Sequence, residues 1–381
     1  MAYSIAMNKA LEIHKKLKGK IEICPKIKVT KKNLGLIYTP GVVEVNREIV
    51  KNPLSSFEYT GRGNNVAIIT DGSRTLGVGD SIPEASLPVM EGKALFLKTL
   101  ANVNAYPLCL NTKSKEEIIR TIEILSPNFG AFNLEDIRAP KSLEIMEELK
   151  EKDLILFHDD EQGVAIVVLA ALLNALKVVG KKLNQVKICI GGAGAAGYGI
   201  FKILNYVGIK NLIVFDSKGI IFKGRGGDNK YLKEIAQLTN KENLRGAKKE
   251  AINKSDVFIG VTGIGNLLDN LDVKLMKEKP IIFALSNPSP EIFPEEIKKA
   301  TKNCIFATGR SDFENQINNI IVFPGVFRGL LDFRKKMDLA LEFKIAKAIA
   351  SLVKKPNAKN IIPNPFDKRL LKTIVFCIRR Y

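Results

Sequence analysis

The chain has 381 residues, of which 46% are apolar and 26% charged, so it can form two globular domains and is not a disordered chain. Its 59 lysines and arginines outnumber its 40 acidic residues and give a formal net charge of +19, which raises the question of nucleic-acid binding. The basic residues are scattered, however, and no basic block is interleaved with aromatic residues. We interpret the charge as a lysine-rich solvated surface that can attract a dianionic substrate or a cofactor phosphate, and we expect no nucleic-acid partner.

The five cysteines lie far apart and include no C-x-x-C pair, so the sequence indicates neither a disulfide framework nor a thiolate zinc site. A reducing compartment fits this pattern, and we expect the protein in the cytoplasm. The opening MAYSIAMNKALEIHKK lacks the apolar core of a signal peptide, and the longest apolar run, residues 164–173, is too short to span a bilayer. We therefore expect no membrane association and place that run in a buried helix.

The chain has only two histidines, His14 and His158. Histidine is the side chain that most often transfers protons near neutral pH. An enzyme with this sequence is therefore expected to move protons with lysine, tyrosine or carboxylate groups.

The first part of the chain alternates helical and strand-like segments. Residues 6–18 have apolar residues at helical spacing, and residues 66–70 form a β-branched run that predicts a strand. The glycine- and proline-rich stretch 77–88 indicates a structured loop, and a helix is predicted over about 91–101. Short strands and helices then alternate to about residue 157.

A more regular alternation begins at residue 187. Strands separated by helical stretches are predicted at residues 187–190, 212–215, 256–261, 280–285 and 304–307. This alternation is typical of a doubly wound parallel sheet, and the tail from about residue 327 is predicted to be mostly helical. We therefore predict an α/β protein with an N-terminal α/β domain over residues 1–160 and a C-terminal Rossmann-like domain with a helical tail over residues 161–381.

A glycine-rich turn lies between the first two strands of the C-terminal part. It has the pattern G-x-G-x-x-G and consists of Gly192, Ala193, Gly194, Ala195, Ala196 and Gly197. A strand precedes the turn and a helix follows it, which is the context in which such a turn binds the pyrophosphate of a dinucleotide. A purely structural turn is the alternative.

Two further features concern the cofactor. Asp216 ends the next predicted strand, where a carboxylate accepts a hydrogen bond from the ribose 2′-hydroxyl and favours NAD. Lys218 and the basic surface leave NADP open. A second glycine pair, Gly263 and Gly265, follows the strand at 256–261 and is either a cofactor contact or a plain loop.

Acidic pairs follow two apolar runs of the N-terminal part. Glu135 and Asp136 are adjacent in N-L-E-D-I, and Asp159 and Asp160 are adjacent in F-H-D-D. Carboxylates that close neighbouring strands can converge, and three of them would bind a hard dication such as Mg²⁺ or Mn²⁺. Helix capping and surface salt bridges are the alternatives.

Short motifs occur in a fixed order along the chain. The first part contains Y-T-P-G-V, Y-T-G-R-G-N, T-D-G-S-R-T-L-G-V-G-D, L-P-V-M-E-G-K-A, N-L-E-D-I and F-H-D-D. The second part contains the glycine-rich turn, S-N-P, T-G-R-S-D, N-N and F-P-G-V-F-R-G. With these motifs in this order and spacing, the chain resembles the malic enzyme family over residues 34–329, and its length is similar to that of the compact bacterial and archaeal members.

The resemblance implies roles for individual residues. Tyr38 matches the proton-donating tyrosine of the family, and Lys93 matches its general base. Glu135, Asp136 and Asp160 match the three metal ligands of the family, and Asp159 matches a neighbouring catalytic aspartate. Asn287 and Asn318 match two asparagines that contact substrate or the nicotinamide end of the cofactor. Arg74 matches an arginine that binds a malate carboxylate in many members. In water the pKa of a lysine makes it a poor base, and we expect burial and the nearby dication to lower the pKa of Lys93.

The sequence departs from the family pattern at three positions. The family usually has glycine near Ile82 and near Ser86, and a small polar residue near Val164. A side chain in place of glycine restricts the backbone. These changes affect the expected rate and specificity but none of the expected ligands or proton carriers.

The resemblance implies the oxidative decarboxylation of (S)-malate to pyruvate and CO₂ with reduction of NAD or NADP, through oxaloacetate held at Mg²⁺ or Mn²⁺. It also implies a homodimer or a larger homo-oligomer. The alternatives are a malolactic-type decarboxylase or another 2-hydroxy-acid dehydrogenase, and a catalytically silent nucleotide-binding regulator.

Overall fold

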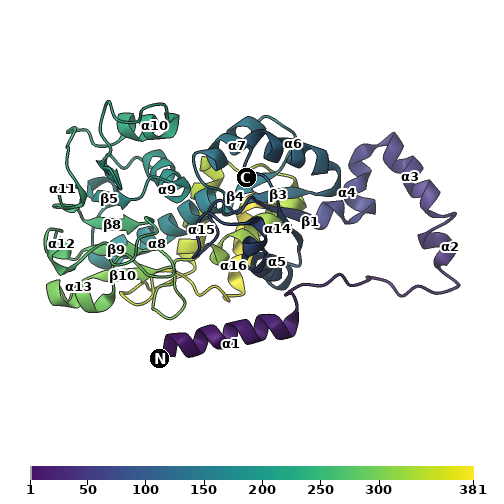
Figure 1. Ribbon diagram of the computed structural model, residues 1–381, viewed down its shortest axis with the longest axis horizontal. Coiled ribbons are helices and arrows are strands. Elements are labelled where there is room, and N and C mark those ends of the chain that lie inside the picture. The colour runs from purple at the N-terminus through teal and green to yellow at the C-terminus, as the bar shows by residue number, and fades with distance from the viewer. Residues whose placement is uncertain (1) are drawn as a thin grey trace.

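The computed structural model describes residues 2–381, which contain two separate β-sheets (Figure 1). The strand order is β2-β1-β3-β4 in the first sheet and β10-β9-β8-β5-β6-β7 in the second. Neighbouring strands are parallel throughout, except that β7 pairs antiparallel with β6. The predicted α/β class with a doubly wound parallel sheet is confirmed.

The first sheet is buried on both faces, as its apolar strands require. Its strands are β1 (Asn65–Thr70), β2 (Asn104–Cys109), β3 (Ala131–Leu134) and β4 (Leu156–His158). One face packs against α6 (Lys115–Leu125) and α7 (Lys141–Leu149). The other face packs against α5 (Leu87–Ala101) and α14 (Phe323–Phe333). Helix α5 begins four residues before the predicted start because Pro88 is favourable in a first helical turn.

The second sheet contains each strand predicted for the C-terminal part. Its strands are β5 (Lys187–Gly191), β6 (Asn211–Asp216), β7 (Gly219–Ile220), β8 (Val257–Gly260), β9 (Ile281–Ala284) and β10 (Ile305–Thr308). One face packs against α8 (Val164–Val179), α9 (Ala195–Tyr206) and α10 (Lys230–Leu238). The other face packs against α11 (Lys248–Ile252), α12 (Asn270–Lys274) and α13 (Pro294–Ala300).

The apolar helix α8 lies between the two sheets, and it packs against α9 and α15 (Leu339–Ser351). Together with the turn before it, the stretch Asp159–Val179 has the length and hydropathy of a membrane span, but 72% of its most apolar window is buried inside the protein. This burial agrees with the core helix expected from the sequence. The helical tail is also confirmed, because α14, α15 and α16 (Arg369–Arg379) follow one another, and α14 returns to the first sheet.

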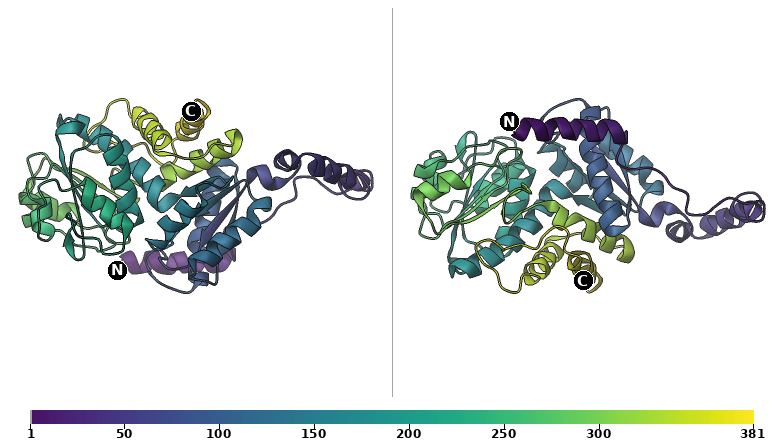
Figure 2. Two further views of the ribbon diagram at one scale, coloured as in Figure 1. Left: turned by 90° about the horizontal axis from the view of Figure 1, so that it is seen from above. Right: turned by 90° about the horizontal axis from the view of Figure 1, so that it is seen from below.

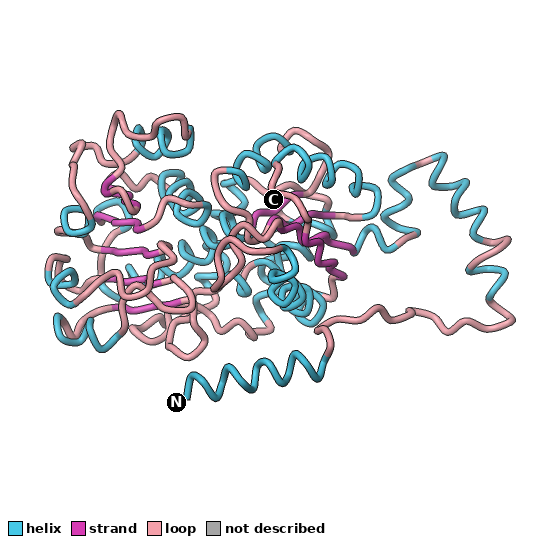
Figure 3. The backbone as a smooth tube through the Cα atoms, in the orientation of Figure 1, coloured by secondary structure: helices cyan, strands magenta, loops and turns pink. Residues whose placement is uncertain are grey.

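An N-terminal arm, residues 21–55, projects from the body on the side away from the second sheet (Figures 1 and 2). It contains α2 (Leu34–Ile37) and α3 (Val42–Lys51), and neither helix has a buried residue. Within the arm, a long loop leads from α1 (Ala2–Leu17) to α2 (Figure 3). The short helix α4 (Ser56–Tyr59) connects the arm to the first sheet. The arm exposes apolar side chains such as Ile23, Leu36 and Val50.

Candidate active site

Four carboxylates meet where two neighbouring strands end. Glu135 and Asp136 directly follow β3, and Asp159 and Asp160 directly follow β4, which pairs in parallel with β3. Parallel strands end at the same edge of a sheet, so the two acidic pairs are brought together. Ligand oxygens of Glu135, Asp136 and Asp160 lie within 4.8 Å of one another.

The backbone around Asp136 has an unusual conformation. Its φ of 52° is in the left-handed region, which few residues other than glycine adopt. Its amide donates to Oδ2 of Asp160 over 2.8 Å, and its own Oδ2 accepts from the amide of Leu76 over 3.2 Å. The amide of Arg74 donates to its carbonyl oxygen over 3.0 Å. These bonds connect the loop after β1 to the acidic cluster.

Lys93 is buried on α5 and faces the carboxylates. Its Nζ donates to Oε1 of Glu135 over 2.5 Å and also to Oδ2 of Asp159. Nζ lies 4.8 Å from the centroid of the Phe323 ring, a cation–π contact. Asn133 donates to the other oxygen of Glu135 over 2.8 Å. The amine is therefore fixed beside the three-carboxylate cluster.

The carboxylates around Lys93 decide the direction of its pKa shift. Burial alone lowers the pKa of this ammonium, as expected. The carboxylates of Asp159 and Glu135, followed by Asp160, raise it by more, so the net shift of the Lys93 pKa is upward. The expected decrease required burial together with a bound dication, so it stays a prediction for the metal complex.

Lys93 offsets only part of the negative charge of the acidic cluster. Burial, followed by the charge of Asp160, raises the pKa of Asp136 to about 7. Burial is also the largest cause of the increase in the pKa of Glu135, to which the neighbouring aspartates contribute. Buried carboxylates that repel one another are stabilised by a bound dication, and oxygen ligands suit Mg²⁺ or Mn²⁺. The residues present therefore fit such an ion.

The acidic cluster opens into a cleft of about 690 Å³ between the two sheets. Residues from both parts of the chain line it, including Arg74, Lys93, Asp160, Val164, Ala196, Gly263, Asn287, Asn318 and Phe323. Nδ2 of Asn318 donates to the carbonyl oxygen of Gly309 over 3.3 Å, and Nδ2 of Asn287 would lie 3.0 Å from a Cβ added at Gly309. The two asparagines thus occupy neighbouring positions on the cleft wall.

The glycine-rich turn has the structure expected for dinucleotide binding. Gly192 has a φ of 104°, and an added Cβ would lie 2.7 Å from the carbonyl oxygen of Val261. An added Cβ at Gly197 would collide with the carbonyl oxygen of Gly192. An added Cβ at Gly194 would meet only Nη1 of Arg74, at 3.8 Å, and Gly194 immediately precedes α9, whose first-turn amides can bind a phosphate. The residues present therefore fit a dinucleotide.

Asp216 ends β6 as predicted, and one of its oxygens is already engaged. Its Oδ1 accepts from the amide of Lys218 over 2.8 Å and forms an ion pair with Arg225. Arg225 also donates to the carbonyl oxygens of Gly219 and Ile220, over 2.6 and 2.9 Å. Oδ2 of Asp216 remains available to a ribose hydroxyl.

Tyr38 lies apart from the other expected site residues. It follows α2 on the projecting arm, its side chain is 67% exposed, and it does not line the cleft. The structure thus brings together the expected base, metal ligands, asparagines and arginine, but not the expected proton donor of the same chain.

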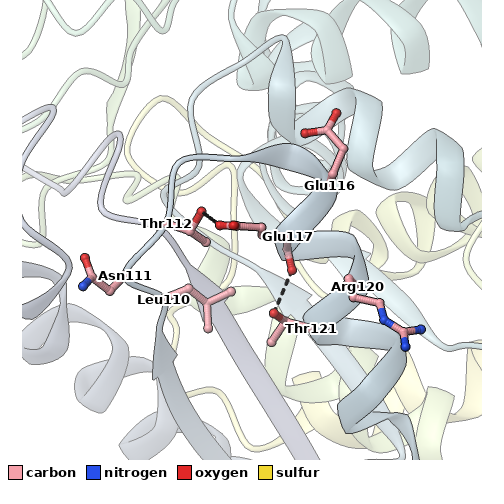
Figure 4. Close-up of a pocket in the computed structure, with 7 residues that line it drawn as sticks. All are labelled: Leu110, Asn111, Thr112, Glu116, Glu117, Arg120 and Thr121. Atoms are coloured by element: carbon pink, nitrogen blue, oxygen red, sulfur yellow. Dashed lines mark hydrogen bonds between the residues drawn. The ribbon is translucent and has the colours of Figure 1, made fainter.

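A second hollow, of about 570 Å³, lies at the start of α6 (Figure 4). Glu117 there bonds to Thr112 through its carboxylate and accepts from Thr121 at its carbonyl oxygen over 2.7 Å. The hollow is shallow and has none of the expected site residues, so it does not extend the catalytic centre.

Sequence reasoning missed Glu291, which connects two loops of the cleft. Its buried carboxylate accepts from the amide and hydroxyl of Ser286, over 3.1 and 2.5 Å, and from the amide of Thr262 over 3.1 Å. Gly263 in turn donates to the hydroxyl of Ser286 over 2.7 Å. No local pattern indicates this role, because the partners come from separate loops; the expected alternative of cofactor contact at Gly263 stays a prediction.

The fold and the cleft together define a dinucleotide-binding α/β protein with an acidic, lysine-containing centre. Two family models match it: the malic enzyme N-terminal domain over residues 18–120 and the malic enzyme NAD binding domain over residues 161–369. The chain belongs to the malic enzyme family.

Its relatives agree with this assignment. The chain is 45% identical to a bifunctional malic/malolactic enzyme of Bacillus subtilis, over 97% of this chain and 92% of the relative. It is 46% identical to a NAD-dependent malic enzyme of Geobacillus stearothermophilus, over 93% and 75% respectively. The solved NAD-dependent malic enzyme of Thermotoga maritima has a TM-score of 0.92 and 43% identity, covering 97% of this chain and 98% of that one.

Proposed function

We propose that the protein oxidises malate to pyruvate and CO₂ and reduces NAD or NADP. The observation that supports this most is the amine of Lys93 beside a three-carboxylate cluster, in a cleft that also contains a dinucleotide turn. We further propose that residues 1–160 form the substrate domain and residues 161–381 the dinucleotide domain. We also propose that the protein works in the cytoplasm, because its five cysteines are unpaired.

Glu135, Asp136 and Asp160 are the proposed ligands of Mg²⁺ or Mn²⁺. When bound, the cation supplies a Lewis acid for the decarboxylation and the nicotinamide supplies the hydride acceptor. A dication held by these carboxylates would offset the negative charges that raise the pKa of Lys93, and would thus favour the free-amine form of Lys93.

Lys93 is the proposed general base for the 2-hydroxyl of malate. Asp159 holds the amine through its Oδ2, while its Oδ1 is buried and has no hydrogen-bond partner among the described residues. Gly163 leaves room for this carboxylate, since an added Cβ would collide with Oδ1. Asp159 therefore positions the base. Asn287 and Asn318 line the opposite wall and can donate to a substrate carboxylate.

Tyr38 is the proposed proton donor to the carbon that loses CO₂. Because it does not line the cleft of its own chain, we propose that it acts in the cleft of a second chain. The arm that carries it has exposed apolar side chains without a core of its own, a surface typical of an interface. We infer a homodimer in which the arm packs on the partner and brings Tyr38 to the partner's cleft.

NAD is the proposed preferred cofactor. The carboxylate of Asp216 favours a free ribose 2′-hydroxyl over a 2′-phosphate. Arg225, the basic group beside it, is held by Asp216 and two carbonyl oxygens and is therefore poorly placed to turn toward a phosphate.

A spectrophotometric assay of malate with NAD or NADP, with and without Mn²⁺, tests the proposal. We expect Mn²⁺-dependent reduction, faster with NAD, with pyruvate as product. Lactate formed without net cofactor reduction would instead identify a malolactic decarboxylase. Full activity after exhaustive chelation would contradict the role of the carboxylates.

A further inference from the structure

Glu291 is a buried carboxylate behind the wall of the cleft. Its oxygens accept from the amides and hydroxyls of Thr262 and Ser286, over 2.5 to 3.1 Å. Amides can only donate, so these contacts suit the charged carboxylate rather than the neutral acid. All four donors are neutral groups, and no lysine, arginine or histidine of the described part of the chain forms an ion pair with Glu291. The protein therefore keeps an uncompensated negative charge here.

The fold leaves room for this carboxylate beside the cofactor turn. Strand β8 ends in Gly260, and a Cβ added there would lie 2.4 Å from the carboxyl carbon of Glu291, too close for any side chain. β8 pairs with β5, and the amide of Val261 bonds to the carbonyl oxygen of Gly191 over 2.8 Å, just before the glycine-rich turn. The strand order switches direction between β5 and β8, and open α/β sheets bind their ligands at such a point.

One layer of atoms separates the Glu291 charge from the cleft. Gly263 and Ser286 line the cleft, and the hydroxyl of Ser286 accepts from the amide of Gly263 over 2.7 Å while it donates to Glu291. A ligand atom in contact with this hydroxyl would lie roughly 6–7 Å from the carboxylate, the sum of a hydrogen bond and a van der Waals contact. Salt screens a buried charge little at that distance.

The nicotinamide half of a dinucleotide would lie against this layer. Asp216, the proposed partner of a ribose hydroxyl, ends β6 on one side of β5, and the glycine-rich turn follows β5 itself. A dinucleotide with its adenosine ribose at Asp216 and its pyrophosphate at the turn would extend its other half over β8 and β9. Gly263 and Ser286 follow these two strands, with Glu291 behind them.

We propose that Glu291 makes the cleft bind the oxidised cofactor more tightly than the reduced one. The nicotinamide ring is positively charged in NAD⁺ and neutral in NADH, because the transferred hydride neutralises it. A fixed negative charge behind the ring stabilises bound NAD⁺ and has no net charge to attract in the ring of NADH. The same preference favours replacement of NADH by NAD⁺ after each turnover. The inference rests on the proposed function only in that the cleft takes a nicotinamide dinucleotide.

The test compares the binding of cofactor forms without malate or metal. Dissociation constants of NAD⁺ and NADH are measured by calorimetry for the wild type and for Glu291→Gln. The side-chain amide of glutamine cannot accept two sets of donors, so some loss common to both cofactors is expected. The ratio of the two constants isolates the charge, and we expect the NAD⁺ complex to weaken at least about fivefold more than the NADH complex.

Two control variants separate charge from packing. Ser286→Ala removes a hydroxyl that bonds to Glu291 but keeps the carboxylate, so it should weaken NAD⁺ and NADH by similar factors. Glu295→Gln removes a carboxylate from an exposed position at the start of α13 and should leave the ratio unchanged. Unchanged thermal unfolding of Glu291→Gln shows that the variant is folded.

A measurement on the wild type gives the same information without a variant. Benzamide adenine dinucleotide has a planar aromatic amide like that of NAD⁺, but its ring is neutral. We expect the wild type to bind NAD⁺ at least about fivefold more tightly than this analogue. This comparison decides the question if Glu291→Gln does not fold.

Each outcome decides one point. Equal losses of NAD⁺ and NADH affinity in Glu291→Gln, or equal affinities of the wild type for NAD⁺ and the benzamide analogue, would overturn the inference and leave Glu291 only a structural role. The same change of ratio in Glu295→Gln would overturn it too, because the effect would then come from the overall charge. A wild type that shows the expected preference but does not oxidise malate would contradict the proposed function and leave the inference intact.

Discussion

The Nζ atom of Lys93 lies 2.5 Å from Oε1 of Glu135, in a place where both side chains are buried. A proposed base and a proposed metal ligand thus share a hydrogen bond in the protein without a cation. Oε1 of Glu135 cannot bind the Lys93 amine and a cation equally well at the same time. Cation binding is therefore expected to weaken the hydrogen bond between Glu135 and Lys93. We therefore expect metal binding and activation of the base to be linked.

Replacement of Lys93 by alanine is predicted to lower kcat for malate oxidation by roughly 10²- to 10⁴-fold, the usual contribution of a general base. The dissociation constant for NADH should change little, because Lys93 lies on the wall opposite the glycine-rich turn. Lys93→Arg is the control, since it keeps the charge but cannot act as a base near neutral pH. A rate of Lys93→Ala close to that of the wild type would remove Lys93 from the mechanism.

A mixing experiment tests whether Tyr38 serves a second chain. Tyr38→Phe and Lys93→Ala should each be nearly inactive alone. If the proton donor comes from the partner, unfolding and refolding them together gives mixed dimers with one intact site, and about a quarter of the wild-type activity returns for random pairing in a two-fold dimer. If Tyr38 acts within its own chain, no mixture regains activity.

The hydroxyl of Ser86 is predicted to support the acidic cluster. It lies 2.7 Å from the hydroxyl of Thr75, whose neighbours in sequence bond to Asp136. Ser86→Ala removes one hydrogen bond, which contributes about 1 kcal/mol. If this loss falls entirely on the metal complex, the variant should bind Mn²⁺ roughly fivefold more weakly. Ser142→Ala is the matched control, because Ser142 is equally buried and its hydroxyl has no partner among the described residues. Equal Mn²⁺ affinities in the two variants would contradict this role.

Glu342 is predicted to make the protein less stable at alkaline pH. Burial raises its pKa to about 8 from the ordinary value of 4.5; the hydrogen bond from Gln162 and the charge of Lys202 oppose the shift, and the charges of Glu161 and Asp338 add to it. The folded state therefore binds a proton that the unfolded state has lost between pH 4.5 and 8, so this group reduces the free energy of unfolding as the pH rises through that window.

Glu342→Gln removes this titration and keeps the acceptor for Gln162, whose Nε2 donates over 2.9 Å. The free energy of unfolding of the variant should match that of the wild type at pH 5 and exceed it by on the order of 4 kcal/mol at pH 9. Denaturant unfolding at the two pH values measures the difference. If the free energies of unfolding of wild type and variant differ by the same amount at pH 5 and pH 9, Glu342 does not titrate in this range.

Much of the fold could be predicted because the signals are local. The strands of the second sheet are short apolar runs between helices, and the glycine-rich turn has its strand and helix next to it in sequence. The convergence of Asp136 and Asp160 was also predictable, since carboxylates that follow parallel strands meet at one edge.

The remaining features depend on contacts between distant segments. The upward shift of the Lys93 pKa requires knowing which carboxylates face the amine, and the direction of Arg74 depends on bonds to Asp136. The return of α14 to the first sheet places Phe323 over Lys93, and no motif shows this. The separation of Tyr38 from the cleft depends on how the arm projects from the body, which no local sequence pattern encodes.

A crystal of the protein soaked with Mn²⁺ and measured for anomalous scattering tests the carboxylate cluster most directly. The predicted result is one strong peak within about 2.0–2.6 Å of oxygens of Glu135, Asp136 and Asp160, with the amine of Lys93 outside the coordination sphere. A peak at another site, with these three carboxylates left without a cation, would contradict the central claim.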